Sequence, residues 1–146
     1  MFTLYNQWVI FDTLWGGSAP TVNIKIGLSS TPPNIEGGNI TNPGGNYAPV
    51  SLTTDDFSMV EIGSPLTDVY VKNDDAIDFI ESGPSTPWGT VSHWTLEVEI
   101  SPSVFELYDY GLITNRLTGA PEPKTIGTED IFSFDPDKLI FRFKNT

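Results

Sequence analysis

The N-terminal residues carry apolar side chains at the spacing of an α-helix. Leu4, Trp8, Phe11 and Trp15 recur at intervals of four and three residues, which places them on one stripe of a helix. The pair Gly16-Gly17 follows directly and provides a helix end. The pattern predicts a short N-terminal helix whose stripe covers the apolar face of a sheet.

The same segment has a second apolar strip, formed by Phe2, Tyr5 and Val9. These side chains lie roughly 100–160° around the helix from the first stripe. Monomers seldom expose a contiguous apolar patch of this kind, and aromatic side chains anchor interfaces. We therefore expect Phe2, Tyr5 and Val9 to form an interface with a neighbouring subunit. The alternative is that the long loop over residues 29–46 folds over them.

From residue 21 onward the apolar period changes to two, which is typical of β-strands. Apolar residues alternate with polar or small ones over residues 21–28, and again over residues 93–100. Each run predicts a strand with one buried and one wet face, and the wet face of the second comprises His93, Thr95, Glu97 and Glu99. Shorter strand candidates cover residues 47–53, 57–62, 69–72, 76–80, 104–110, 131–134 and 139–143.

Turn residues separate these candidates. The segment 29–46 is rich in Ser, Asn, Pro and Gly and predicts a long surface loop, and residues 115–124 predict another. Residues 135–138 predict a hairpin turn with Pro136 in its second position, and Pro49 puts its strand at a sheet edge or at a bulge. The pattern predicts a mainly β protein, an antiparallel β-sandwich or barrel with one short N-terminal helix. We expect one domain over residues 1–146, with the helix in 1–17 and the sandwich in 18–146.

Composition and charge narrow the possible partners. The 146 residues include 7 Lys+Arg against 19 Asp+Glu, a formal net charge of −12. Such a surface repels phosphate backbones, so we expect no nucleic-acid partner. No apolar run is long enough to span a membrane and no basic flank suggests a secretion signal, so we expect a soluble, unprocessed protein without a membrane partner. The absence of cysteine excludes disulfides and thiolate chemistry.

Few residues suggest catalysis or metal binding. The chain has one histidine, His93, which predicts a surface or hydrogen-bonded structural role. The acidic pairs Asp55-Asp56, Asp74-Asp75 and Asp135/Asp137 have ligand types that suit Ca²⁺, but aspartates are also typical of turns, the interpretation we favour. Glu97 and Glu99 share one strand face and are interpreted as solvated. We therefore predict no catalytic residues, no cofactor and no metal.

Aromatic residues suggest one further possibility, a sugar-binding platform. Trp8 and Trp15 belong to the helix stripe and Trp94 to the buried phase of its strand, which leaves Trp88 as the exposed candidate, together with Tyr108 and Tyr110. Because one exposed tryptophan makes a small platform, core packing is the favoured use of these rings. A carbohydrate-binding module stays open as an alternative.

Several short motifs follow one another along nearly the whole chain. They are the helix ending in Trp15-Gly16-Gly17, then Ile26-Gly27-Leu28-Ser29-Ser30-Thr31-Pro32-Pro33, Gly44-Gly45-Asn46-Tyr47-Ala48, Trp88-Gly89-Thr90-Val91-Ser92-His93-Trp94, and a closing Lys124-Thr125-Ile126, Glu129-Asp130, Phe132 and residues 139–143. In this order they resemble a widespread family of small bacteriophage virion proteins, often labelled tail-fibre or head-decoration proteins. The chain departs from the family in Ser101-Pro102-Ser103, where a short Gly turn is usual, in a longer segment 115–123, and in Glu129-Asp130, where Gly-Asp is usual.

The resemblance implies a structural virion protein and not an enzyme. Family members are placed on the capsid exterior, as decoration or cement proteins, or in the tail. The chain lacks the repeats or coiled-coil shaft of a fibre, which favours the capsid exterior. We therefore expect a cement protein that is made in the bacterial cytoplasm, docks on the major capsid protein and self-associates as a homotrimer. A tail-fibre or tail-adaptor subunit is the alternative within this class.

Overall fold

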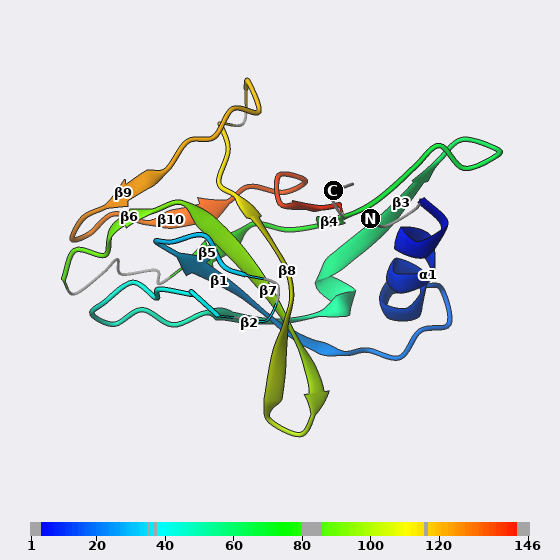
Figure 1. The fold of residues 1–146 in the computed structure, drawn as a ribbon, viewed down its shortest axis with the longest axis horizontal. Helices are drawn as coiled ribbons and strands as arrows, with labels where there is room; N and C mark the ends of the chain where they lie inside the picture. The colour runs from blue at the N-terminus through cyan, green and yellow to red at the C-terminus, as the bar shows by residue number, and fades with distance from the viewer. Residues whose placement is uncertain (1–3, 35, 37, 80–85, 116, 143–146) are drawn as a thin grey trace. The chain divides into compact units, whose positions relative to one another are not determined.

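The computed structural model describes residues 4–34, 36, 38–79, 86–115 and 117–142, with residues 4–7 described by their backbone alone. Within these residues the protein is mainly antiparallel β-sheet with one short N-terminal helix (Figure 1), which confirms the predicted sandwich-like class; none of the described sheets closes into a barrel. The elements are α1 (Leu4–Trp15), β1 (Asn23–Ser29), β2 (Val50–Thr53), η1 (Thr54–Asp56), β3 (Phe57–Ile62), β4 (Asp68–Asn73), β5 (Ile77–Phe79), β6 (Gly89–Val91), β7 (His93–Ser101), β8 (Val104–Leu112), β9 (Lys124–Ile126), β10 (Phe132–Phe134) and β11 (Ile140–Phe141).

The chain forms two compact units, each assembled from separate segments. Unit 1 comprises Met1–Asn23, Thr53–Ile77 and Phe134–Thr146, and unit 2 comprises Ile24–Leu52 and Asp78–Ser133. The single domain expected from the sequence stays a prediction.

Unit 1 combines α1 with the three-stranded sheet β11-β4-β3. The helix covers the interval that its apolar period predicts, and Phe11 is buried. Trp15 packs against Phe57 and Phe141, with ring centroids 6.3 and 6.4 Å away. These contacts place the C-terminal part of the predicted stripe against the sheet, and the Leu4 side chain lies outside the described residues. No described helix is long and apolar enough to cross a membrane.

Unit 2 contains the four-stranded sheet β2-β1-β7-β8. Strands β1 and β7 pair antiparallel, with Ile24 opposite Val98 and Leu28 opposite Trp94, and all four side chains are buried. β2 lies at the edge of the sheet, one of the two alternatives that Pro49 predicts. The segment between β1 and β2 contains no helix or strand in its described part, in agreement with the predicted loop.

The predicted wet face of β7 is wrong over its first half. His93 and Thr95 are buried, because further segments of unit 2 cover this part of the sheet, and Ser92 Oγ lies 2.7 Å from His93 Nδ1. The hydrogen bond predicted for His93 is present, and its structural role stays a prediction. On the opposite phase Ile100, expected in the core, is 57% exposed because it lies near the tip of the β7–β8 hairpin.

Strand pairing corrects one further prediction and adds one strand pair that was not predicted. Residues 135–138 do form a turn, with the Lys138 N–H donating to the Asp135 carbonyl at 3.2 Å, but it is not a hairpin turn. The strands that flank it belong to different sheets, since β10 pairs with β5 and β11 with β4. The pair β6–β9 was not predicted, because three-residue strands are too short to show a period.

Candidate functional site

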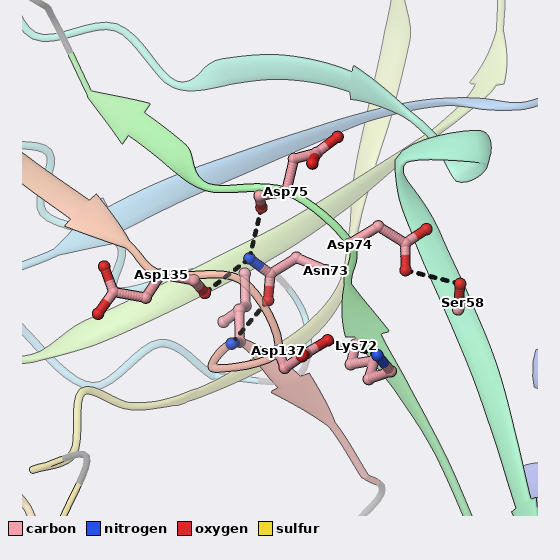
Figure 2. A network of polar contacts seen from close by, with 8 residues as sticks. Ser58, Lys72, Asn73, Asp74, Asp75, Asp135 and Asp137 are labelled. Carbon is pink, nitrogen blue, oxygen red and sulfur yellow. Dashed lines mark hydrogen bonds and ion pairs between the residues drawn. The ribbon is translucent and has the colours of Figure 1, made fainter.

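Each acidic pair has a carboxylate engaged within unit 1, and of these three only Asp56 has a partner of the local kind expected of a turn residue; the partners of Asp74 and Asp137 are remote in sequence. In unit 1 the Thr53 N–H donates to Asp56 Oδ2 at 2.8 Å, which caps η1, and Ser58 Oγ donates to Asp74 Oδ1 at 2.6 Å (Figure 2). Asp137 forms an ion pair with Lys72. Within the described residues, no group of three or more His, Asp or Glu side chains is placed to hold a metal ion.

The aspartates around β4 surround a buried amide, that of Asn73. Its Nδ2 donates to the carbonyls of Asp75 at 2.8 Å and Asp135 at 3.0 Å, and its Oδ1 accepts from the Leu139 N–H at 2.9 Å (Figure 2). Asn73 is fully buried, so these bonds replace those that water would make. This centre has a structural role, and sequence reasoning missed it because an Asn beside two Asp is typical of an exposed turn.

The structure does not support the aromatic sugar platform. Trp88, expected to be exposed, is 4% exposed and packs edge-on against Tyr47 with ring centroids 5.4 Å apart. Tyr108 and Tyr110 are half-buried, and burial, with a smaller contribution from the Asp109 charge, raises the pKa of Tyr108 to about 12. The expectation of an exposed Trp88 is therefore wrong.

The predicted interface strip is described only in part. Phe2 and the side chain of Tyr5 lie outside the described residues, whereas Val9 is 39% exposed on α1. Trp8, from the first stripe, donates its indole N–H to Glu61 Oε1 at 2.6 Å. The interface assignment of Phe2, Tyr5 and Val9 stays a prediction.

Unit 2 contains a feature that sequence reasoning did not find, a pocket of about 240 Å³ on the polar face of the sheet. We call it the Glu97 pocket. Its lining residues come from β1, from β7, from the long loop and from the segment before β2: Gly27, Ile40, Asn42, Tyr47, Pro49, Thr95 and Glu97.

Tyr47 connects the pocket to the core of unit 2. The Leu28 N–H donates to the Tyr47 hydroxyl oxygen at 2.8 Å, and the Tyr47 ring packs on Trp88. Burial raises the pKa of Tyr47, the hydrogen bond from Leu28 opposes this shift, and the charge of Glu97 adds to it. The hydroxyl therefore stays neutral at physiological pH and keeps a proton to donate.

A glycine leaves room for the Tyr47 and Thr95 hydroxyls. Gly27 lies opposite Thr95 in the β1–β7 register, and a Cβ on Gly27 would come within 2.7 Å of Thr95 Oγ1 and 2.9 Å of the Tyr47 hydroxyl. Both approaches are shorter than real Cβ contacts. The glycine thus leaves space beside β1 for both hydroxyls.

Glu97 lies one pleat repeat further along β7, opposite Lys25 of β1. The Lys25 ammonium does not pair with it, because Lys25 Nζ lies 4.0 Å from the centroid of the Phe105 ring. In the described part of the chain the Glu97 carboxylate makes no hydrogen bond or ion pair. The pocket is therefore lined by a carboxylate that has no ion-pair partner among the described residues.

The sequence did contain one signal of this pocket. Gly27, Thr95 and Glu97 all fall on the wet phase of their strands, and a loop of the length of 29–46 is often functional. Tyr47 and Pro49, from another segment of the chain, also line the pocket. The hydrophobic period of a strand does not indicate which part of its wet face such a segment covers. Comparisons with family models, curated proteins and solved structures found no match to this chain.

Proposed function

We propose that this chain is a structural protein of a bacteriophage virion, a decoration or cement protein that docks on the outer surface of the capsid and stabilises it. The observation that carries the proposal is the meeting of three separate motifs at Tyr47. These motifs are the ones whose order along the chain resembles small virion proteins.

Each motif contributes one part of a packing unit. The motif over residues 26–33 provides the Leu28 N–H, which donates to Tyr47, and Gly27, which leaves room for the Tyr47 hydroxyl. The motif over residues 44–48 provides Tyr47 itself. The motif over residues 88–94 provides Trp88, against which the Tyr47 ring packs. Residues that are far apart in the sequence and meet in one core specify a fold. In this chain three of the motifs thus belong to one packed core, which supports the proposal.

The charge of the chain supports docking on a basic or neutral surface. With a formal net charge of −12, the protein would be repelled by an acidic partner and by packaged DNA, so an outward position on the shell is favoured. The proposal includes self-association as a homotrimer and the major capsid protein as the partner. A tail-fibre or tail-adaptor subunit is the alternative.

The test is to locate the protein on purified particles with an antibody in negative-stain images. Label on the head supports the cement role, label on the tail supports the alternative, and particles without label contradict both. A salt series tests whether docking is electrostatic, because raising NaCl to about 1 M shortens the Debye length to about 3 Å. Release from heads by salt would indicate electrostatic docking, and full retention would indicate that apolar contact dominates.

A further inference from the structure

We propose that the Glu97 pocket binds a primary ammonium group, supplied by a lysine side chain of the surface on which the protein docks. The choice of a protein lysine as the source rests on the proposed function. The preference for an ammonium group rests on the pocket alone.

The charge of the pocket favours a cationic ligand. The Glu97 carboxylate lines the pocket without an ion-pair partner among the described residues, since its register neighbour Lys25 has its ammonium over the Phe105 ring. An anionic ligand would be repelled at this position. A cation would supply the charge that the fold leaves unmatched, with a charge-assisted hydrogen bond to the carboxylate.

The hydrogen-bonding groups of the pocket favour an ammonium group. An ammonium group has three N–H donors and no acceptor. Beside the Glu97 carboxylate, the pocket offers the Thr95 hydroxyl oxygen and the Asn42 amide oxygen, and neither side chain makes a hydrogen bond within the described residues. Three acceptors of this kind match the three donors of one ammonium group.

The volume and lining of the pocket favour a single extended side chain. About 240 Å³ is below the range of roughly 300–1,000 Å³ that is typical of pockets for drug-sized ligands, so the site suits one extended side chain. Ile40 and Pro49 provide apolar walls beside the polar groups. Such walls cover the methylene stem of a lysine while its charged end meets the carboxylate.

The test is an NMR titration of the full chain with n-butylammonium chloride at constant ionic strength. We expect saturable shifts of the Gly27 and Thr95 amide signals. With 1-butanol, which has the same stem without the charge, we expect no saturable shift. Equal response to 1-butanol would overturn the ammonium assignment, as would tighter binding of a neutral monosaccharide, which would make the pocket a glycan site.

The chain offers a matched pair of variants. Glu97→Gln should weaken n-butylammonium binding at least about tenfold, because it removes the carboxylate but keeps the shape. Glu99→Gln removes the same charge from the same strand at a residue that does not line the pocket, and should change binding by less than about twofold. Equal effects of the two variants would show that only net charge matters and would overturn the proposal.

Attachment of the same variants to particles separates this inference from the proposed function. If particles carry the protein and Glu97→Gln loosens attachment more than Glu99→Gln, the lysine source is supported. If particles carry both variants equally, the lysine source is wrong although the proposed function stands. If n-butylammonium binds through Glu97 but no particle carries the protein, the proposed function and the lysine source fail together, and the ammonium preference of the pocket stands.

Discussion

Gly27 and Thr95 lie opposite each other in neighbouring strands, and the Thr95 hydroxyl occupies the space where a side chain on Gly27 would begin. The Tyr47 hydroxyl limits the same space from the other side. Gly27 and Thr95, which alternation alone assigns to wet strand faces, thus line a pocket. The first prediction follows from this crowding.

Gly27→Ala should lower the free energy of unfolding by about 1–3 kcal/mol, because the new methyl group displaces the Thr95 or Tyr47 hydroxyl. Gly44→Ala is the control, since a Cβ on Gly44 would meet nothing within 4 Å. Urea unfolding of both variants measures the difference. Adding Thr95→Ala to Gly27→Ala should recover part of the loss, and equal stability of the Gly27 and Gly44 variants would contradict the crowding argument.

Ser103 is a second position where backbone geometry favours glycine. It follows Pro102 in the β7–β8 hairpin turn and has φ of 62°, a region that costs most L-residues energy. Ser103→Gly should therefore raise the free energy of unfolding by about 1 kcal/mol. Ser101→Gly, at the end of β7, should lower it by about 0.5–1 kcal/mol. Thermal melts that rank the two variants in the reverse order would rule out a strained turn.

Local period predicted the elements of this fold well where they are long enough to repeat. α1 spans its apolar stripe, β3 has the bounds expected from its sequence, and the edge position of β2 is one of the two alternatives that Pro49 predicts. Period assigns a residue to one of two faces but does not say what covers that face. For this reason alternation assigns Thr95 to the wet face, although Thr95 is buried and lines a pocket together with Tyr47, a residue remote in sequence.

The candidate site was harder to predict than the fold. Glu97 looked like a solvated carboxylate, and only the β1–β7 register together with the position of Lys25 over Phe105 shows that its charge is unmatched inside a pocket. Trp88 precedes the three-residue strand β6, which is too short to indicate whether its neighbours are buried. Contacts between distant segments decide both cases, and a single sequence does not show them.

The raised pKa of Tyr108 predicts a late step in alkaline titration. Burial holds this hydroxyl neutral until a pKa of about 12, whereas a tyrosine in the unfolded chain ionises near 10. Between pH 10 and 12 the unfolded state therefore binds fewer protons than the folded state, so stability falls as pH rises through this range. Absorbance of tyrosinate near 295 nm should show a step near pH 12 that Tyr108→Phe removes. A step that persists in this variant would assign it to another tyrosine.

The buried Asn73 amide provides the last prediction, which uses pH to separate charge from shape. Asn73→Asp keeps the acceptor for the Leu139 N–H but loses both donations, to the carbonyls of Asp75 and Asp135, and places a carboxylate in a fully buried site. At pH 7 we expect a loss of about 2–4 kcal/mol in the free energy of unfolding.

Protonation of the new carboxyl should reduce this loss. Burial raises its pKa in the folded state above the value near 3.9 of the unfolded chain, so the penalty is complete above the folded pKa and shrinks as pH falls through it. Urea unfolding at pH 7 and pH 4.5 should therefore show Asn73→Asp approaching the wild type at the lower pH. The control is Asn34→Asp, because Asn34 Oδ1 accepts from the Gly38 and Glu36 N–H groups at 2.8 and 3.1 Å and a carboxylate accepts both equally well. A gap between Asn73→Asp and the wild type that does not change with pH would mean that the lost donors, and not the buried charge, account for the whole effect.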